Sequence, residues 1–176
     1  MSINSVAIEH LLICWTEPNK EEFQHETKKY KYYNKSHFSQ AIDTSDKNLL
    51  IQLIEKLRNV LPNSQLTLLT SWNNLICENL VVQEVSTVTW TFHQTVDWLR
   101  QHSFDAALIF TPPTRSPYAM AYACYLAGIP IRVGQSCEFG GGVLSICVTP
   151  CDTDSIGDFC WHLLHSSIPI LCGSEF

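Results

Sequence analysis

A loop that follows an apolar segment carries the first residues suited to chemistry. Residues 106–110 (AALIF) lead through TPPTRSP into an alanine- and tyrosine-rich segment, and the loop holds Arg115 and Ser116. The planar guanidinium of an arginine matches a phosphate or carboxylate, and the start of a helix favours an anion through its free N–H groups and dipole. Arg115 and Ser116 are therefore candidates for binding an anionic ligand.

A second candidate group lies further along the chain, at Arg132 and the run Gly140, Gly141 and Gly142. Consecutive glycines allow a backbone to approach a ligand closely or to form an anion-binding concavity. Arg115 and Arg132 are the last basic residues of a C-terminal half that is otherwise acidic. The alternative is structural: Ser116 caps a helix, the arginines pair with Asp105 or Glu138, and the glycines only turn the chain.

The sequence contains eight cysteines, without CxxC spacing and in apolar surroundings. We expect reduced and mostly buried thiols. Zinc is an alternative for a C-terminal group whose spacing matches zinc sites only loosely, namely Cys147, Cys151, Cys160, His162 and His165. Cysteine and histidine are too numerous to single out a hydrolase pair, and the GxSxG, P-loop and GxGxxG motifs are absent. We predict no metal and no cofactor.

The periodicity of apolar residues predicts alternating helices and strands. Helices are expected at 49–60, with Asp46 as N-cap, at 94–102, at 116–126 ending at Gly128, and at 154–164. Strands are expected at 6–15, 65–70, 80–85, 106–110 and 129–133. Strands that are apolar on both faces and alternate with helices are typical of an α/β fold, with a parallel sheet covered by helices on both faces.

Charge and hydropathy narrow the classes of partner. The net charge of −6 opposes nucleic-acid binding, although lysines and aromatic residues alternate between 20 and 37. No segment is long and apolar enough for a membrane span, and the N-terminus does not read as a signal peptide. We therefore expect a cytoplasmic protein.

The segment FDAALIF, followed by SPYAMAYACYLAGIPIRVGQSCEFGGGVLS, resembles the N-terminal half of family 9 glycosyltransferases, the heptosyltransferase-like enzymes of lipopolysaccharide core assembly, in their cyanobacterial form. The preceding LIQLIEKLRNVLPNSQLTLLTS is similar to an early element of the same family, so the resemblance covers about 49–150. It implies the Rossmann-like N-terminal domain of a GT-B enzyme. In such enzymes this domain binds the acceptor, a second domain binds the nucleotide sugar, no metal is needed, and a carboxylate is the general base.

The resemblance places Arg132 at the arginine of the family's LAGIPxR element, and Arg115 with Ser116 in the loop that matches the family's acceptor-side loop. It implies a lipid-linked oligosaccharide as acceptor, a separate nucleotide-sugar-binding domain as partner, and peripheral association with the inner membrane. The family's Gly-Asp pair after the first strand is absent, and Glu17 is a weak substitute, so the catalytic residues stay unknown.

We expect three regions: an N-terminal segment 1–48, an acceptor domain 49–153, and a C-terminal helix and tail 154–176. The length of 176 residues leaves no room for a donor-binding half. The alternative function is a non-catalytic binding module or relic without transferase activity.

Overall fold

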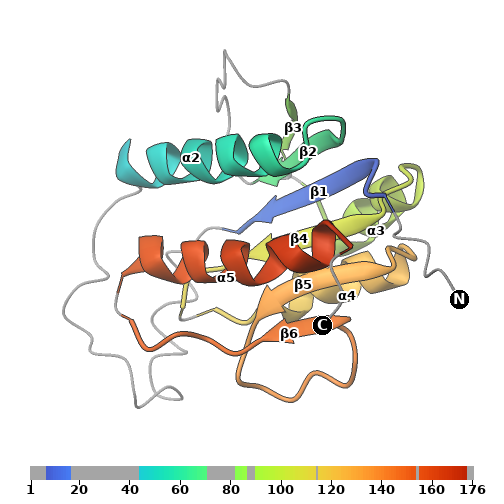
Figure 1. Cartoon of the computed structure of the whole chain (residues 1–176). Helices are drawn as coiled ribbons and strands as arrows, with labels where there is room; N and C mark the ends of the chain where they lie inside the picture. Colours follow the sequence, from blue (N-terminus) through green and yellow to red (C-terminus); the bar gives the residue numbers. More distant parts are fainter. Residues whose placement is uncertain are drawn as a thin grey trace, which may run out of the picture.

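Among the residues that the structure describes, six parallel strands form one sheet with the order β3-β2-β1-β4-β5-β6, seen in Figure 1. The computed structural model describes residues 7–16, 44–70, 82–86, 90–113, 115–153 and 155–173, with the backbone alone at 44–46 and 82–86. The strands are β1 His10–Trp15, β2 Gln65–Thr70, β3 Val82–Ser86, β4 Ala106–Phe110, β5 Ile131–Gln135 and β6 Ile146–Val148. The predicted α/β fold with a Rossmann-like parallel sheet is confirmed.

Helices cover both faces of the sheet. Helices α2 Thr44–Val60 and α5 Ile156–Leu171 lie on one face, and α3 Phe92–Arg100 and α4 Tyr118–Leu126 lie on the other (Figure 1). Alternate residues of β1 serve the two layers, since Leu11 and Ile13 pack towards α2 and α5 while Leu12 packs towards α3 and α4. This arrangement explains why β1 is apolar from Leu11 to Trp15 and β4 is apolar at every position.

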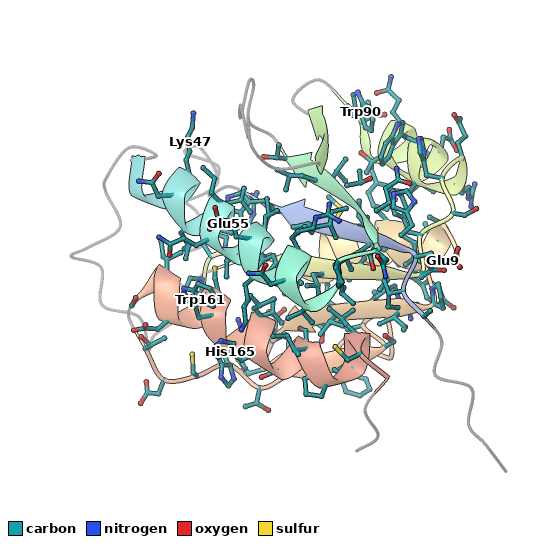
Figure 2. The ribbon with its side chains drawn as sticks, turned by 45° about the horizontal axis from the view of Figure 1, so that its top comes forward. Glu9, Lys47, Glu55, Trp90, Trp161 and His165 are labelled. Carbon is teal, nitrogen blue, oxygen red and sulfur yellow. The ribbon has the colours of Figure 1, made fainter. Side chains whose placement is uncertain are left out.

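Helix α5 belongs to the same core as the strands. Its Leu163 and Leu164 are buried in the same cluster as Leu108 of β4 and Val133 of β5, and half-buried Trp161 packs against this cluster with its ring centroid 5.6 Å from that of the exposed His165 (Figure 2). The expected boundary at 154 therefore does not separate the core. Likewise, the segment before residue 49 supplies β1, which lies between β2 and β4.

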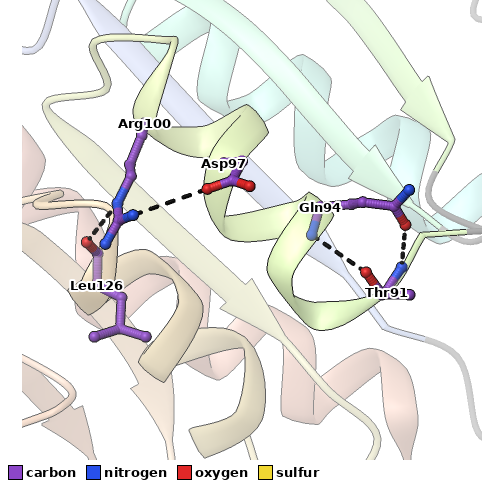
Figure 3. A network of polar contacts seen from close by, with 5 residues as sticks. All are labelled: Thr91, Gln94, Asp97, Arg100 and Leu126. Atoms are coloured by element: carbon purple, nitrogen blue, oxygen red, sulfur yellow. Dashed lines mark hydrogen bonds and ion pairs between the residues drawn. The ribbon is translucent and has the colours of Figure 1, made fainter.

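Two helix ends follow well-known capping rules. Thr91 begins α3 with a capping box, because its Oγ1 accepts from the Gln94 amide N–H while the Gln94 side chain accepts from the Thr91 N–H (Figure 3). Gly128 ends α4 in the left-handed region at φ 85°, and Ile129 donates its N–H to the Cys124 carbonyl, as in a Schellman motif. The predicted stop at Gly128 is confirmed.

Some expected boundaries are wrong. Helix α2 begins at Thr44, so Asp46 lies inside the helix and is not its N-cap. Helix α5 begins at Ile156 and continues to Leu171, beyond the expected end at 164 and through Pro169. A proline in the last turn breaks only one backbone hydrogen bond, and burial of Leu171 favours continuing the helix. Strand β6 was not among the strands expected from the sequence, although Cys147 lies in a run of strand-like residues.

Within the described residues, no helix is long and apolar enough to cross a membrane.

Candidate functional site

The order of the strands reverses between β1 and β4, and this is where open parallel sheets bind ligands, outside the carboxyl ends of the strands. Thr16 follows β1 and joins the two strands, because its amide and its Oγ1 each donate to the Phe110 carbonyl at 3.2 Å. Gln135, at the end of β5, is buried, and its Nε2 donates to the Phe159 carbonyl at 2.8 Å. The candidate site is therefore the edge formed by the carboxyl ends of β1, β4, β5 and β6.

Polar side chains meet at this edge in a group that we call the Ser116 cluster, consisting of Ser116, Tyr118, Ser136, Glu138 and Cys147. Ser116 Oγ donates to Glu138 Oε2 at 2.8 Å, and the Glu138 amide donates to Ser136 Oγ at 3.0 Å. Cys147 Sγ donates to the Ser136 carbonyl at 3.3 Å. These contacts join the β4–α4 loop to the β5–β6 loop, so hydroxyl groups and a carboxylate lie side by side.

Tyr118 holds the two loops together. Its hydroxyl donates to the Glu138 carbonyl at 2.8 Å and lies 4.0 Å from Cys147 Sγ. Burial, followed by the contact with Cys147, raises the pKa of Tyr118 above its ordinary value.

The Tyr118 ring also explains one of the three glycines. A Cβ on Gly140 would lie 1.8 Å from Tyr118 Cε1, so the ring can lie in this position only over a glycine. Gly141 and Gly142 have φ angles of 57° and 80°, the left-handed region that glycine adopts without strain. All three glycines thus have a role in shaping the loop.

Arg132 is directed at backbone carbonyl oxygens. Its Nε donates to Val143 O at 2.6 Å, its Nη1 donates to Ile129 O and to Pro130 O, and its Nη2 donates to Gly142 O at 3.4 Å. The guanidinium carbon lies 5.3 Å from the Tyr125 ring centroid, and the residue is only 9% exposed. The guanidinium therefore binds the glycine loop to the end of α4.

The structure separates the predicted residues into two places. Arg115 and Ser116 lie on the β4–α4 loop at the carboxyl edge, whereas Arg132 occupies the second position of β5, near the opposite edge. Arg115 is half-buried, and its amide donates to Pro112 O at 2.9 Å. Asp105 Oδ2, considered as a partner for an arginine, accepts instead from the amides of Glu9 and His10. Anion binding by these residues stays a prediction.

The cysteines are less buried than expected. Cys14, Cys124 and Cys160 are buried, whereas Cys137, Cys147 and Cys172 are exposed and Cys151 is half-buried, so the prediction of mostly buried thiols is wrong for the described residues. A hydrogen bond with the Cys124 thiol, and then burial, raise the pKa of Cys14 well above its ordinary value. Cys77 and Glu17 lie outside the described residues.

The proposed zinc ligands do not come together. Cys160 is in the core, His162 Nε2 lies 3.0 Å from the Thr149 carbonyl, and the His165 ring is tilted at 47° to the Trp161 ring. Over the described ranges, no group of at least three histidine, cysteine, aspartate or glutamate residues could hold a metal ion.

Comparison with known proteins adds no neighbour. No protein-family model, curated protein or solved structure matches the chain. The candidate site thus rests on the fold and on the contacts described above.

The sequence did not single out Tyr118 or Ser136 as members of a site; it considered Cys147 only as a zinc ligand and Glu138 only as an ion-pair partner. A usable signal was present for Ser136 and Glu138, because both follow directly after β5 and therefore lie at the carboxyl edge. Tyr118 gave no such signal, since its contact with Gly140 depends on how the glycine loop folds back.

Proposed function

We propose that this chain is the acceptor-binding domain of a family 9, heptosyltransferase-like glycosyltransferase, and that it transfers a sugar only together with a nucleotide-sugar-binding domain. The observation that carries the proposal is the Ser116 cluster, a hydroxyl–carboxylate group at the carboxyl edge of a sheet with the order β3-β2-β1-β4-β5-β6. Rossmann-like domains bind their ligands at that edge. The resemblance of 104–145 to the family supplies the class of ligand.

The chemistry of the cluster suits a sugar. A carboxylate accepts hydrogen bonds at about four lone-pair positions, so Glu138 can accept from acceptor hydroxyls as well as from its partners in the protein, among them Ser116 Oγ. Glu138 is exposed, and ligands can therefore reach it from solvent. Hydrogen bonds to a carboxylate are about twice as strong as neutral ones, which favours Glu138 as the group that orients an acceptor hydroxyl.

Arg115 supplies positive charge on the same loop. It precedes Ser116, whose Oγ accepts from the Tyr118 amide at 3.4 Å where α4 begins. A guanidinium beside the positive end of a helix dipole favours a phosphorylated acceptor. Arg115 would thus recognise the phosphate and Glu138 a hydroxyl group of one phosphorylated core oligosaccharide.

The test is a titration of the ¹⁵N-labelled chain with a phosphorylated core oligosaccharide. We expect amide shift changes confined to the loops 111–118 and 136–142. Glu138→Gln should weaken binding about tenfold, the loss of one charge-assisted hydrogen bond. Glu55→Gln, the same change on the exposed side of α2, is the matched control and should leave the affinity unchanged. No binding, or equal affinities for both variants, would overturn the proposal.

A second experiment separates the transferase from the alternative, a non-catalytic binding module. The chain alone should not turn over a nucleotide sugar, whereas adding a nucleotide-sugar-binding domain of the family should restore transfer to the bound oligosaccharide. Binding without any transfer in the presence of that domain would assign the chain to the binding module.

A further inference from the structure

Aromatic side chains lie in a row on the outer side of α3 and α4, on the face of the sheet away from α2. Phe92, Tyr122 and Tyr125 are 42%, 46% and 52% exposed. The Phe92 and Tyr122 ring centroids are 6.0 Å apart with an interplanar angle of 17°, and those of Tyr122 and Tyr125 are 6.4 Å apart at 13°. Together with exposed Ala119 they form what we call the α4 face.

Helix α4 is apolar on its outer side as well as on its inner side. Its sequence, YAMAYACYL, contains no charged residue, while Ala121, Ala123 and Cys124 are buried against the sheet. Helix α2, in contrast, presents Lys47 and Glu55 on its outer side (Figure 2). A helix that is hydrophobic all round is normally covered, and an exposed apolar patch marks an interaction site.

We propose that the α4 face is the interface of a homodimer, in which a second copy of this chain packs on it about a two-fold axis. This goes beyond the proposed function and does not depend on it. The interface of a two-fold dimer must be complementary to itself. Exposed residues follow one another along α4 at one-turn spacing in the order Ala119, Tyr122, Tyr125. A two-fold axis at Tyr122 reverses that order, so the small Ala119 faces the large Tyr125 of the second copy.

Charge favours a second copy over other partners. The chain carries a net charge of −6, so two copies can meet only where neither surface is acidic. The α4 face is uncharged, and beside it Asp97 Oδ1 lies 3.8 Å from Arg100 Nη1 (Figure 3). These two opposite charges cancel at the rim of the face. Arg100 Nε also donates to Leu126 O at 3.3 Å and is thereby fixed at the end of α4. An anionic membrane or nucleic acid would instead require an excess of positive charge here.

Sedimentation equilibrium of the full chain tests the proposal. The wild type should be a dimer, and Ala119→Glu should raise the dimer dissociation constant about tenfold or more, because two carboxylates would be buried opposite the tyrosines. Glutamate in the first turn of a helix is favourable for folding, so far-UV circular dichroism and thermal melting should show an intact monomer. Gln52→Glu adds the same charge to the exposed side of α2 and should leave the dimer unchanged.

A photo-cross-linking residue at position 122 gives an independent measurement. It should yield a dimer in which 122 is joined to the α3 or α4 segment of the second copy. A monomeric wild type, an Ala119→Glu variant that dimerises as well as the wild type, or a cross-link to α2 or α5 would each overturn the proposal. A monomer that binds a neutral oligosaccharide through Tyr122 would assign the face to a glycan instead.

Discussion

Replacing Arg132 by alanine should detach the glycine loop from the end of α4. The side chain donates hydrogen bonds to carbonyl oxygens on both sides, those of Ile129 and Pro130 and those of Gly142 and Val143. Because the residue is 9% exposed, water does not compete for the guanidinium in the folded state. The loss should therefore be a loss of stability rather than of affinity for an anion.

The loss in the free energy of unfolding follows from the number and the exposure of the carbonyl groups that Arg132 contacts. Hydrogen bonds from a charged donor contribute about 1.5–3 kcal/mol each. Pro130 and Gly142 are exposed and can be rehydrated, so only the bonds to Ile129 and Val143 are counted in full. Adding about 0.5–1 kcal/mol for the contact with the Tyr125 ring gives a total of about 3.5–7 kcal/mol. For a chain of this size that lowers the melting temperature by about 7–28 °C.

Thermal and urea unfolding, followed by circular dichroism, measure this loss. Arg100→Ala is the matched control, because Arg100 also contacts α4 but its side chain is 55% exposed. Its removal should cost less than about 1 kcal/mol. Arg132→Lys should fall between the two, since an ammonium group keeps the charge but cannot reach carbonyls on both sides at once.

The reasoning is refuted if Arg132→Ala unfolds within about 1 kcal/mol of the wild type. If that variant also bound a phosphorylated oligosaccharide more weakly, Arg132 would be a ligand-binding residue, as the family resemblance implies.

Three further predictions concern packing, pH and thiols. Gly140→Ala should destabilise the fold by about 1–3 kcal/mol, because the new Cβ displaces the Tyr118 ring, and urea unfolding measures this. Burial lowers the pKa of His10 from its ordinary 6.5, so the unfolded chain binds a proton at His10 more readily than the folded chain does. The contribution of His10 to the free energy of unfolding should therefore be complete above pH 6.5 and decrease as the pH falls below it. The midpoints of urea unfolding, measured across this pH range, test this. Cys14 and Cys124 should resist alkylation until the chain unfolds, as mass spectrometry after timed labelling can establish.

Each of these has its own control. Gly157→Ala should be neutral or stabilising, since a Cβ there meets its nearest neighbour at 3.5 Å, and an equal loss in both alanine variants would contradict the packing argument. His10→Asn should flatten the pH dependence between about pH 5 and 7, and an unchanged slope would assign it to other groups. Cys137 is exposed and should be alkylated in the native protein; protection of Cys137 together with labelling of Cys14 would contradict the burial argument.

Local apolar patterns predicted much of the fold. The runs at 65–70 and 106–110 contain enough consecutive apolar or β-branched residues to indicate strands covered on both faces, and both strands lie at the expected residues. Gly128 marked the end of α4 because a residue in the left-handed region is required there. These features depend on neighbours in the sequence, which a single sequence displays.

The environment of Arg132 could not be predicted in this way. Its partners are backbone carbonyls, which every residue has, and only the folded loop brings Gly142 and Val143 to the guanidinium. The same holds for the Ser116–Glu138 hydrogen bond, which links two loops separated by the whole of α4 and β5. From its charge alone, Arg132 could be expected to form an ion pair or to bind an anion. In the structure its guanidinium instead donates hydrogen bonds to backbone carbonyl oxygens.

The position of β1 in the sheet determines which strand edge the chain exposes while it is being synthesised. β1 lies between β2 and β4, and Asp105, which accepts from the His10 amide just before β4, follows His10 by 95 residues. A growing chain therefore exposes one edge of β1, which is apolar from Leu11 to Trp15, on the ribosome until β4 has been synthesised. Chains that end before residue 106 should accordingly aggregate or require a chaperone, and the slowest step of refolding should be the closure of β1 against β4.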